Sequence, residues 1–115
     1  MRGITYILEG REAKPVDDFL EWACWFATAD RIVDRTEVAP GIAVSTVFLG
    51  LDHRHGRDGP PLIFETMTFT DYGGDDCWRW STWNEAQAGH DRVVAELRAK
   101  LADKEKAGEP KLSRP

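Results

Sequence analysis

The strongest constraint on the fold is a pair of β-type runs, residues 42–51 and 62–69, joined by a loop rich in Gly, Pro, Arg and His. Successive residues of a strand face opposite sides of a sheet, and in residues 42–51 both sides are mostly apolar. This pattern predicts a central strand that pairs with residues 62–69 as a long antiparallel hairpin. In the second run, Glu65 shares its side of the strand with three large apolar residues.

Shorter β-type runs flank this hairpin. Residues 5–8 precede a Glu-Gly turn, and residues 31–38 precede an Ala-Pro-Gly turn. Residues 77–80 follow an acidic, glycine-containing turn at residues 71–76. Together with the central hairpin, these runs predict an antiparallel sheet of four to five strands.

A first helix is expected after Pro15 and to end near residue 30, because two acidic residues follow the proline and favour a helix start. Apolar residues recur there at helical spacing and predict a single stripe that packs on the sheet. The stripe consists of Val16, Phe19, Leu20, Ala23, Phe26 and Ala27. Trp22 and Trp25 lie on its flank, where they belong either to the rim of the core or to an interface.

A second helix is predicted to begin at Thr82, because Thr82 and Glu85 fit a capping box. Its predicted apolar face carries His90 among aliphatic side chains. These side chains are Ala86, Val93, Val94, Leu97 and Leu101. Gly108 and Pro110 predict its end.

The chain has 115 residues, 42% of them hydrophobic, which suffices for one domain with a real core. We therefore predict an α+β fold, in which an antiparallel sheet of four to five strands has two helices packed on one face. The predicted domain covers residues 1–108, and a flexible tail is expected over residues 109–115.

The net charge and the cysteine content reduce the number of functional classes to which the chain can belong. The formal net charge of −5 argues against direct non-specific binding to nucleic acid. Cys24 and Cys77 lie far apart and form no CxxC pair, which indicates free thiols in a reducing cytoplasm. Charged residues interrupt every apolar run, so we expect a soluble protein without membrane association.

Several motifs together resemble a family of small proteins encoded by bacteriophages and prophages. These motifs are a Pro-Val-Asp-Asp helix start, VSTVFLGLDH at residues 44–53, GPPLIFETM at residues 59–67 and STW-x-EA-x-AGH at residues 81–90. The resemblance covers about residues 6–90. It implies residence in a phage or mobile element, hence the cytoplasm of a host cell, and assigns no activity.

The leading functional hypothesis is a phage accessory protein that acts by stoichiometric binding of a host or phage protein complex. The candidate binding residues are two acidic groups and three tryptophans: Asp17, Asp18 and Glu21, then Asp71, Asp75 and Asp76, with Trp22, Trp25 and Trp78. Carboxylates are suited to the basic channel of a nucleic-acid-binding defence complex, such as a CRISPR effector, and tryptophans are common interface anchors. A homodimer through the tryptophans is a further expectation.

Two alternatives remain. One is a small metal-dependent or acid/base enzyme that uses Asp52, His53, Glu65 and His90, because carboxylates and imidazoles are common metal ligands and proton carriers. The other is a virion assembly factor. The sequence contains no phosphate-binding glycine loop and no nucleophile motif, so we expect no resident cofactor or metal.

Overall fold

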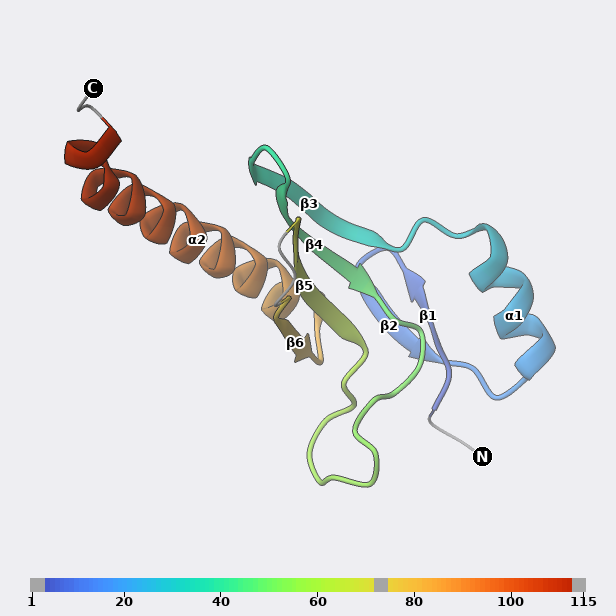
Figure 1. Ribbon diagram of the computed structural model, residues 1–115. Helices are drawn as coiled ribbons and strands as arrows, with labels where there is room; N and C mark the ends of the chain where they lie inside the picture. Colours follow the sequence, from blue (N-terminus) through green and yellow to red (C-terminus); the bar gives the residue numbers. More distant parts are fainter. Residues whose placement is uncertain (1–3, 72–74, 113–115) are drawn as a thin grey trace.

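The computed structural model describes residues 4–71 and 75–112, except for the side chains of 105–112. In chain order the elements are β1 (Tyr6–Glu9), β2 (Glu12–Pro15), α1 (Phe19–Thr28), β3 (Ile32–Ala39), β4 (Ile42–Phe48), β5 (Phe64–Thr70), β6 (Cys77–Trp80) and α2 (Trp83–Leu112). Strands β3 to β6 form an antiparallel sheet in sequence order, while β1 and β2 form a separate hairpin (Figure 1). The helices pack against the sheet, so the predicted α+β class is confirmed.

The β4–β5 hairpin forms the centre of the sheet, as its sequence predicts. The two strands pair without interruption from Ile42 opposite Thr70 to Phe48 opposite Phe64. Val44, Phe48 and Phe64 have no exposed surface and lie on the face that α2 covers. The sheet makes its apolar contact with α2 through this face.

Helix α2 begins at the predicted capping box. The Glu85 amide donates to Thr82 Oγ1 at 3.1 Å, and the Glu85 carboxylate accepts from the Ser81 amide at 3.1 Å. Its first half covers all four strands of the sheet, and its second half extends well beyond them (Figure 1).

The predicted end of α2 is wrong. The helix continues past Gly108 and Pro110 to Leu112. Inside a helix a proline removes one hydrogen bond and its ring crowds the carbonyl four residues earlier, at about 3 kcal/mol, so the last turn of α2 is locally unfavourable although the helix continues through it. Residues 113–115 lie outside the described residues, and the flexible tail stays a prediction.

The segment before α1 also differs from the prediction. Pro15 ends β2 rather than starting a helix, and β2 was not predicted as a strand. Gly10, with φ of 65°, makes the turn between β1 and β2. The hairpin joins the end of β4 through a hydrogen bond of 2.8 Å from the Tyr6 amide to the Gly50 carbonyl.

A buried line of polar side chains runs through the core. His90, only 1% exposed, places Nδ1 2.8 Å from Thr46 Oγ1 and Nε2 2.9 Å from Thr36 Oγ1. Thr46 is hydrogen-bonded to Thr66 at 2.6 Å, and Trp80 Nε1 donates to Thr66 at 2.9 Å. His90 therefore lies on the inner face of α2, as predicted, and its network connects α2 with all four strands of the sheet.

Candidate binding surface on helix α1

Helix α1 is short and sharply defined at its start. Asp18 is the N-cap residue, and its Oδ1 accepts from the Leu20 amide at 2.9 Å and from the Glu21 amide at 3.2 Å. The helix ends at Thr28, before the C-cap residue Ala29.

The inner face of α1 consists of the rings of Trp22, Trp25 and Phe26. Trp22 is 8% exposed and donates from Nε1 to the Tyr6 carbonyl at 3.1 Å. Trp25 meets Phe48 edge-on, with ring centroids 5.8 Å apart. Gly50, with φ of 78°, allows close packing here, because a Cβ at this position would lie 3.1 Å from Phe26 and 3.2 Å from Trp22.

The outer face of α1 is apolar and uncovered. Leu20 is 73% exposed, and Cys24 and Ala27 are exposed beside it. Phe19, in the first turn, is 64% exposed although its ring lies beside Trp22, with centroids 5.5 Å apart. The sequence predicted that Phe19 and Leu20 would pack on the sheet, and this is wrong. The tryptophan side of the helix is buried in their place.

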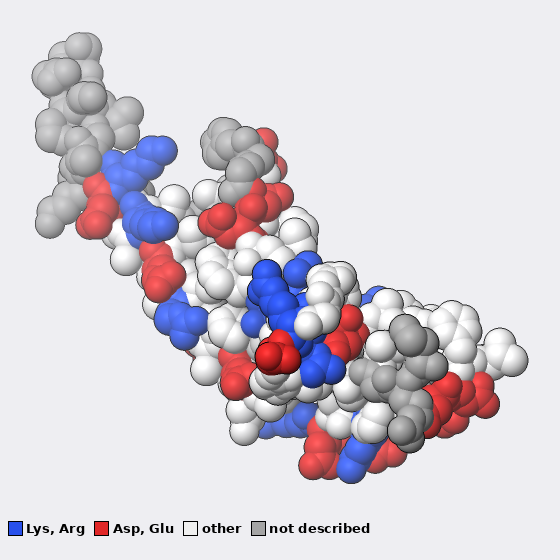
Figure 2. All heavy atoms as spheres, turned by 90° about the horizontal axis from the view of Figure 1, so that it is seen from below, with Lys and Arg blue, Asp and Glu red and all other residues white. Residues whose placement is uncertain are grey.

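The charged residues of α1 and of the segment just before it are all acidic, whereas Arg31, which follows the helix, stacks on Phe26 with its guanidinium 3.9 Å from the ring centroid. Residues 16–30 contain four acidic residues, Asp17, Asp18, Glu21 and Asp30, and no Lys or Arg. In Figure 2 the end of the molecule formed by α1, at the right, shows acidic and uncharged atoms without basic ones. We call Asp17, Phe19, Leu20, Glu21 and Cys24 the α1 surface.

The other predicted binding residues lie elsewhere. Asp71 follows β5 at the end of the sheet where Ile42 pairs with Thr70, whereas α1 contacts the opposite end through Phe48. Asp75 and Asp76 are exposed near Asp71, and Tyr72, Gly73 and Gly74 between them lie outside the described residues. The two acidic groups thus belong to separate surfaces.

The tryptophans named as binding residues lie mostly inside. Trp78 is half-buried and packs against the cluster of Val44, Val93 and Val94. Trp22 and Trp25 form the inner face of α1. Sequence reasoning missed Phe19 and Leu20 as surface residues, although a helix that is apolar on nearly every side already signals an uncovered face.

The residues of the enzyme alternative are not brought together. His90 projects from α2 into the buried interface between this helix and the sheet. Glu65 points from the other face of the sheet and accepts from Arg79 Nε at 3.1 Å. His53 Nδ1 donates to the Leu51 carbonyl at 2.9 Å. In residues 4–71 and 75–112, no cluster of three or more His, Cys, Asp or Glu side chains is arranged to hold a metal ion.

The pKa values of Asp52 and Cys77 are displaced from their ordinary values. Burial alone would raise the pKa of Asp52, but hydrogen bonds from the amides of Arg54 and Leu62 and from the Arg54 side chain outweigh burial and lower it. Partial burial and the neighbouring Glu65 carboxylate raise the pKa of the Cys77 thiol to about 11. Cys77 is therefore protonated at neutral pH and is a poor nucleophile.

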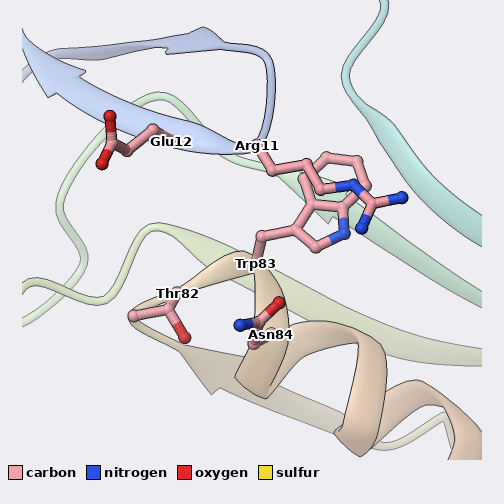
Figure 3. A pocket seen from close by; sticks show the side chains of 5 residues that line it. All are labelled: Arg11, Glu12, Thr82, Trp83 and Asn84. Atoms are coloured by element: carbon pink, nitrogen blue, oxygen red, sulfur yellow. The ribbon is translucent and has the colours of Figure 1, made fainter.

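An open hollow of about 300 Å³ lies between the β1–β2 turn and the start of α2 (Figure 3). Its lining consists of Arg11, Glu12, Thr82, Trp83 and Asn84. The Arg11 guanidinium lies over the Trp83 ring, 5.5 Å from its centroid, and the Thr82 hydroxyl caps the helix. Arg11 and Trp83 thus join the hairpin to the start of α2.

Comparisons with protein-family models, curated proteins and solved structures found no match to this chain. The resemblance to small phage and prophage proteins therefore stays an expectation. Among the described helices, none has both the length and the apolar character that crossing a membrane requires.

Proposed function

We propose that this protein acts by stoichiometric binding of a macromolecular partner through the α1 surface. The observation that carries the proposal is the exposure of Phe19 and Leu20, at 64% and 73%, on an ordered helix. Two adjacent large apolar side chains in water are costly unless a partner covers them, and contiguous apolar patches commonly mark interaction sites.

The charge of the α1 surface indicates the partner's character. Asp17 and Glu21 flank the apolar side chains, and no basic residue lies within residues 16–30. A matching partner presents an apolar groove bordered by Lys or Arg, as a protein built to hold nucleic acid does. A host defence complex of the CRISPR-effector kind is such a partner, and inhibition by occupation of its basic channel is the form of binding that we propose.

The enzyme alternative has weaker support. Glu65 and His90 lie on opposite faces of the sheet, which favours a binding role over catalysis by these residues. A homodimer through α1 is also disfavoured, because two copies of a surface with only acidic charges repel each other.

Affinity capture from host lysate with quantitative mass spectrometry tests this proposal. The wild-type chain should recover one defined complex at a fixed molar ratio, and the Phe19→Ser/Leu20→Ser double variant should lose it. Leu51→Ser is the matched control, because Leu51 is also an exposed apolar residue, at 38%, but lies outside α1. Recovery should fall as salt rises, because the acidic residues steer association.

Circular dichroism should show whether the double variant is folded. Equal recovery of the complex by the wild type and the double variant would exclude α1 as the binding surface. Turnover of a substrate at sub-stoichiometric protein would overturn the binding function itself.

A further inference from the structure

One edge of strand β6 pairs with β5, and no described strand pairs with the other edge. The Thr68 amide donates to the Asp76 carbonyl at 3.0 Å, which fixes the order in which hydrogen-bonded and non-hydrogen-bonded pairs alternate along β5 and β6. By this alternation, the backbone N–H and C=O groups of Cys77 and Arg79 point away from β5. No described group bonds to them, so they are available to an added strand.

An open hollow of about 380 Å³ lies beside this edge. β6 contributes Arg79 and Trp80 to its lining, and the first half of α2 contributes Glu85 and Arg92. Because Arg79 and Trp80 are neighbours in a strand, their side chains leave opposite faces of the sheet. A hollow that both of them line together with α2 therefore lies at the margin of the sheet, where an added strand would run.

The hollow offers one unpaired cation, Arg92. Its guanidinium lies over the Trp80 ring, 5.5 Å from the centroid, and no described carboxylate pairs with it. Arg79 is already paired, with its Nε 3.1 Å from Glu65 Oε2, and the Glu85 carboxylate accepts from a backbone amide at the start of α2. A guanidinium stacked on an aromatic ring keeps its N–H groups free, and their planar fork matches a carboxylate.

The outer edge of β3 is the other place where a strand could be added. Its register with β4 is irregular at two positions, and such irregularities oppose further pairing. β3 also carries Asp34 and Glu37 against a single Arg35, so it repels an acidic segment. β6 pairs with β5 in unbroken register, which leaves its outer edge regular.

We propose that the outer edge of β6 binds an extended acidic peptide segment by strand addition, with a carboxylate of that segment on the Arg92 guanidinium. Hydrogen bonds to the backbone of Cys77 and Arg79 give affinity for any extended chain, and the pair between Arg92 and the carboxylate gives the preference for an acidic one. This site goes beyond the α1 surface, which is acidic and fits a basic partner.

Fluorescence anisotropy with a panel of fluorescein-labelled Val/Thr hexapeptides tests the proposal. Each peptide carries one Glu at a different position, so that the panel offers the carboxylate in every register. With the full chain varied from about 5 to 500 µM, at least one peptide should bind, and its Glu→Gln form should bind about five- to tenfold more weakly. Methylation of the backbone nitrogens of the bound peptide should abolish binding, because it removes the donors of the added strand.

Arg92→Gln should remove the preference for the Glu peptide over its Gln form. Arg98→Gln, at an exposed position further along α2, is the matched control and should keep that preference. In NMR spectra of the complex, the amide resonances of Cys77 and Arg79 should shift more than those of β3. The serine double variant of the α1 surface should bind the peptide as the wild type does, so a failure of the α1 proposal leaves this result unchanged.

Three results would each overturn the proposal. They are the absence of binding by the whole panel, equal binding of the methylated and unmethylated peptides, and an Arg92→Gln variant that still prefers the Glu peptide.

Discussion

Replacing Gly89 with alanine tests how closely α2 packs against β6. A Cβ built on Gly89 lies 2.2 Å from Cζ2 and 2.6 Å from Cε2 of Trp80, far inside van der Waals contact. The ring has little freedom to withdraw, because Trp80 Nε1 donates to Thr66 Oγ1 at 2.9 Å and the ring packs on the core. Either the helix or the indole must therefore move.

Two opposing effects decide the sign of the change in unfolding free energy. In an exposed helix, alanine would stabilise relative to glycine by about 1 kcal/mol. Overpacking costs about 1 to 3 kcal/mol, and loss of the Trp80–Thr66 hydrogen bond adds about 0.5 to 1.5 kcal/mol. Gly89→Ala should therefore destabilise the protein by roughly 0.5 to 3.5 kcal/mol.

Urea denaturation of Gly89→Ala beside the wild type measures this effect. Ala88→Gly at the exposed neighbouring position is the control, and it should cost about 1 kcal/mol through helix propensity alone. In a Trp80→Leu background, Gly89→Ala should become neutral or stabilising, because the ring that it strikes is gone. A higher denaturation midpoint for Gly89→Ala in the wild-type background would refute the close contact.

Three further predictions follow from the described side chains. Leu97→Ala should lower the unfolding free energy by about 1 to 2 kcal/mol, as measured by the urea denaturation midpoint. This is less than the roughly 2 to 5 kcal/mol expected for a fully buried leucine, because Leu97 is only partly buried. Iodoacetamide at pH 7 should alkylate Cys24 before Cys77, because a pKa of about 11 leaves almost no Cys77 thiolate. Peptide mass spectrometry measures the two alkylation rates, and equal rates would contradict the prediction. The pKa of Asp52 is lower in the folded state than in the unfolded state. Its ionised form therefore stabilises the folded protein at pH values above the unfolded-state pKa of about 3.9, and this stabilisation is lost as the pH falls through the folded-state pKa. The stability difference between wild type and Asp52→Asn should thus shrink below about pH 4, whereas a constant difference would exclude the linkage.

The centre of the fold was predictable because its signals are local. Alternation over residues 42–51 defines a strand with two apolar sides, and the Thr82–Glu85 capping box depends only on residues within one turn. The position of His90 on the inner face of α2 follows from helical spacing. Its hydrogen-bond partners on two different strands, Thr36 on β3 and Thr46 on β4, required the tertiary structure.

The orientation of α1 was not predictable in the same way. A helix that is apolar on nearly every side, with Phe19, Leu20, Trp22 and Trp25 spread around it, has no unique apolar stripe. The close approach of Gly50 to the α1 rings decides which side is buried, and Gly50 lies far along the chain. The candidate binding surface therefore became visible only when the exposed side was known.

Strand β2 was missed for another reason. Glu12–Pro15 is short, polar and ends in proline, so its composition favours a loop or helix start over a strand. Its pairing with β1 through the Gly10 turn overrides that preference. Short strands of this kind are specified by their partner rather than by their own residues.

The polar line through the core also has a consequence for strand pairing. A slip of β5 by two residues along β4 would keep every apolar side chain on its own face, so hydrophobic burial alone discriminates poorly against it. A slip that brings Phe64 opposite Thr46 would separate Thr46 from Thr66 and leave buried hydroxyl groups without partners, at a cost of about 1 to 3 kcal/mol each. The threonines and His90 thus disfavour an alignment that apolar packing alone would accept.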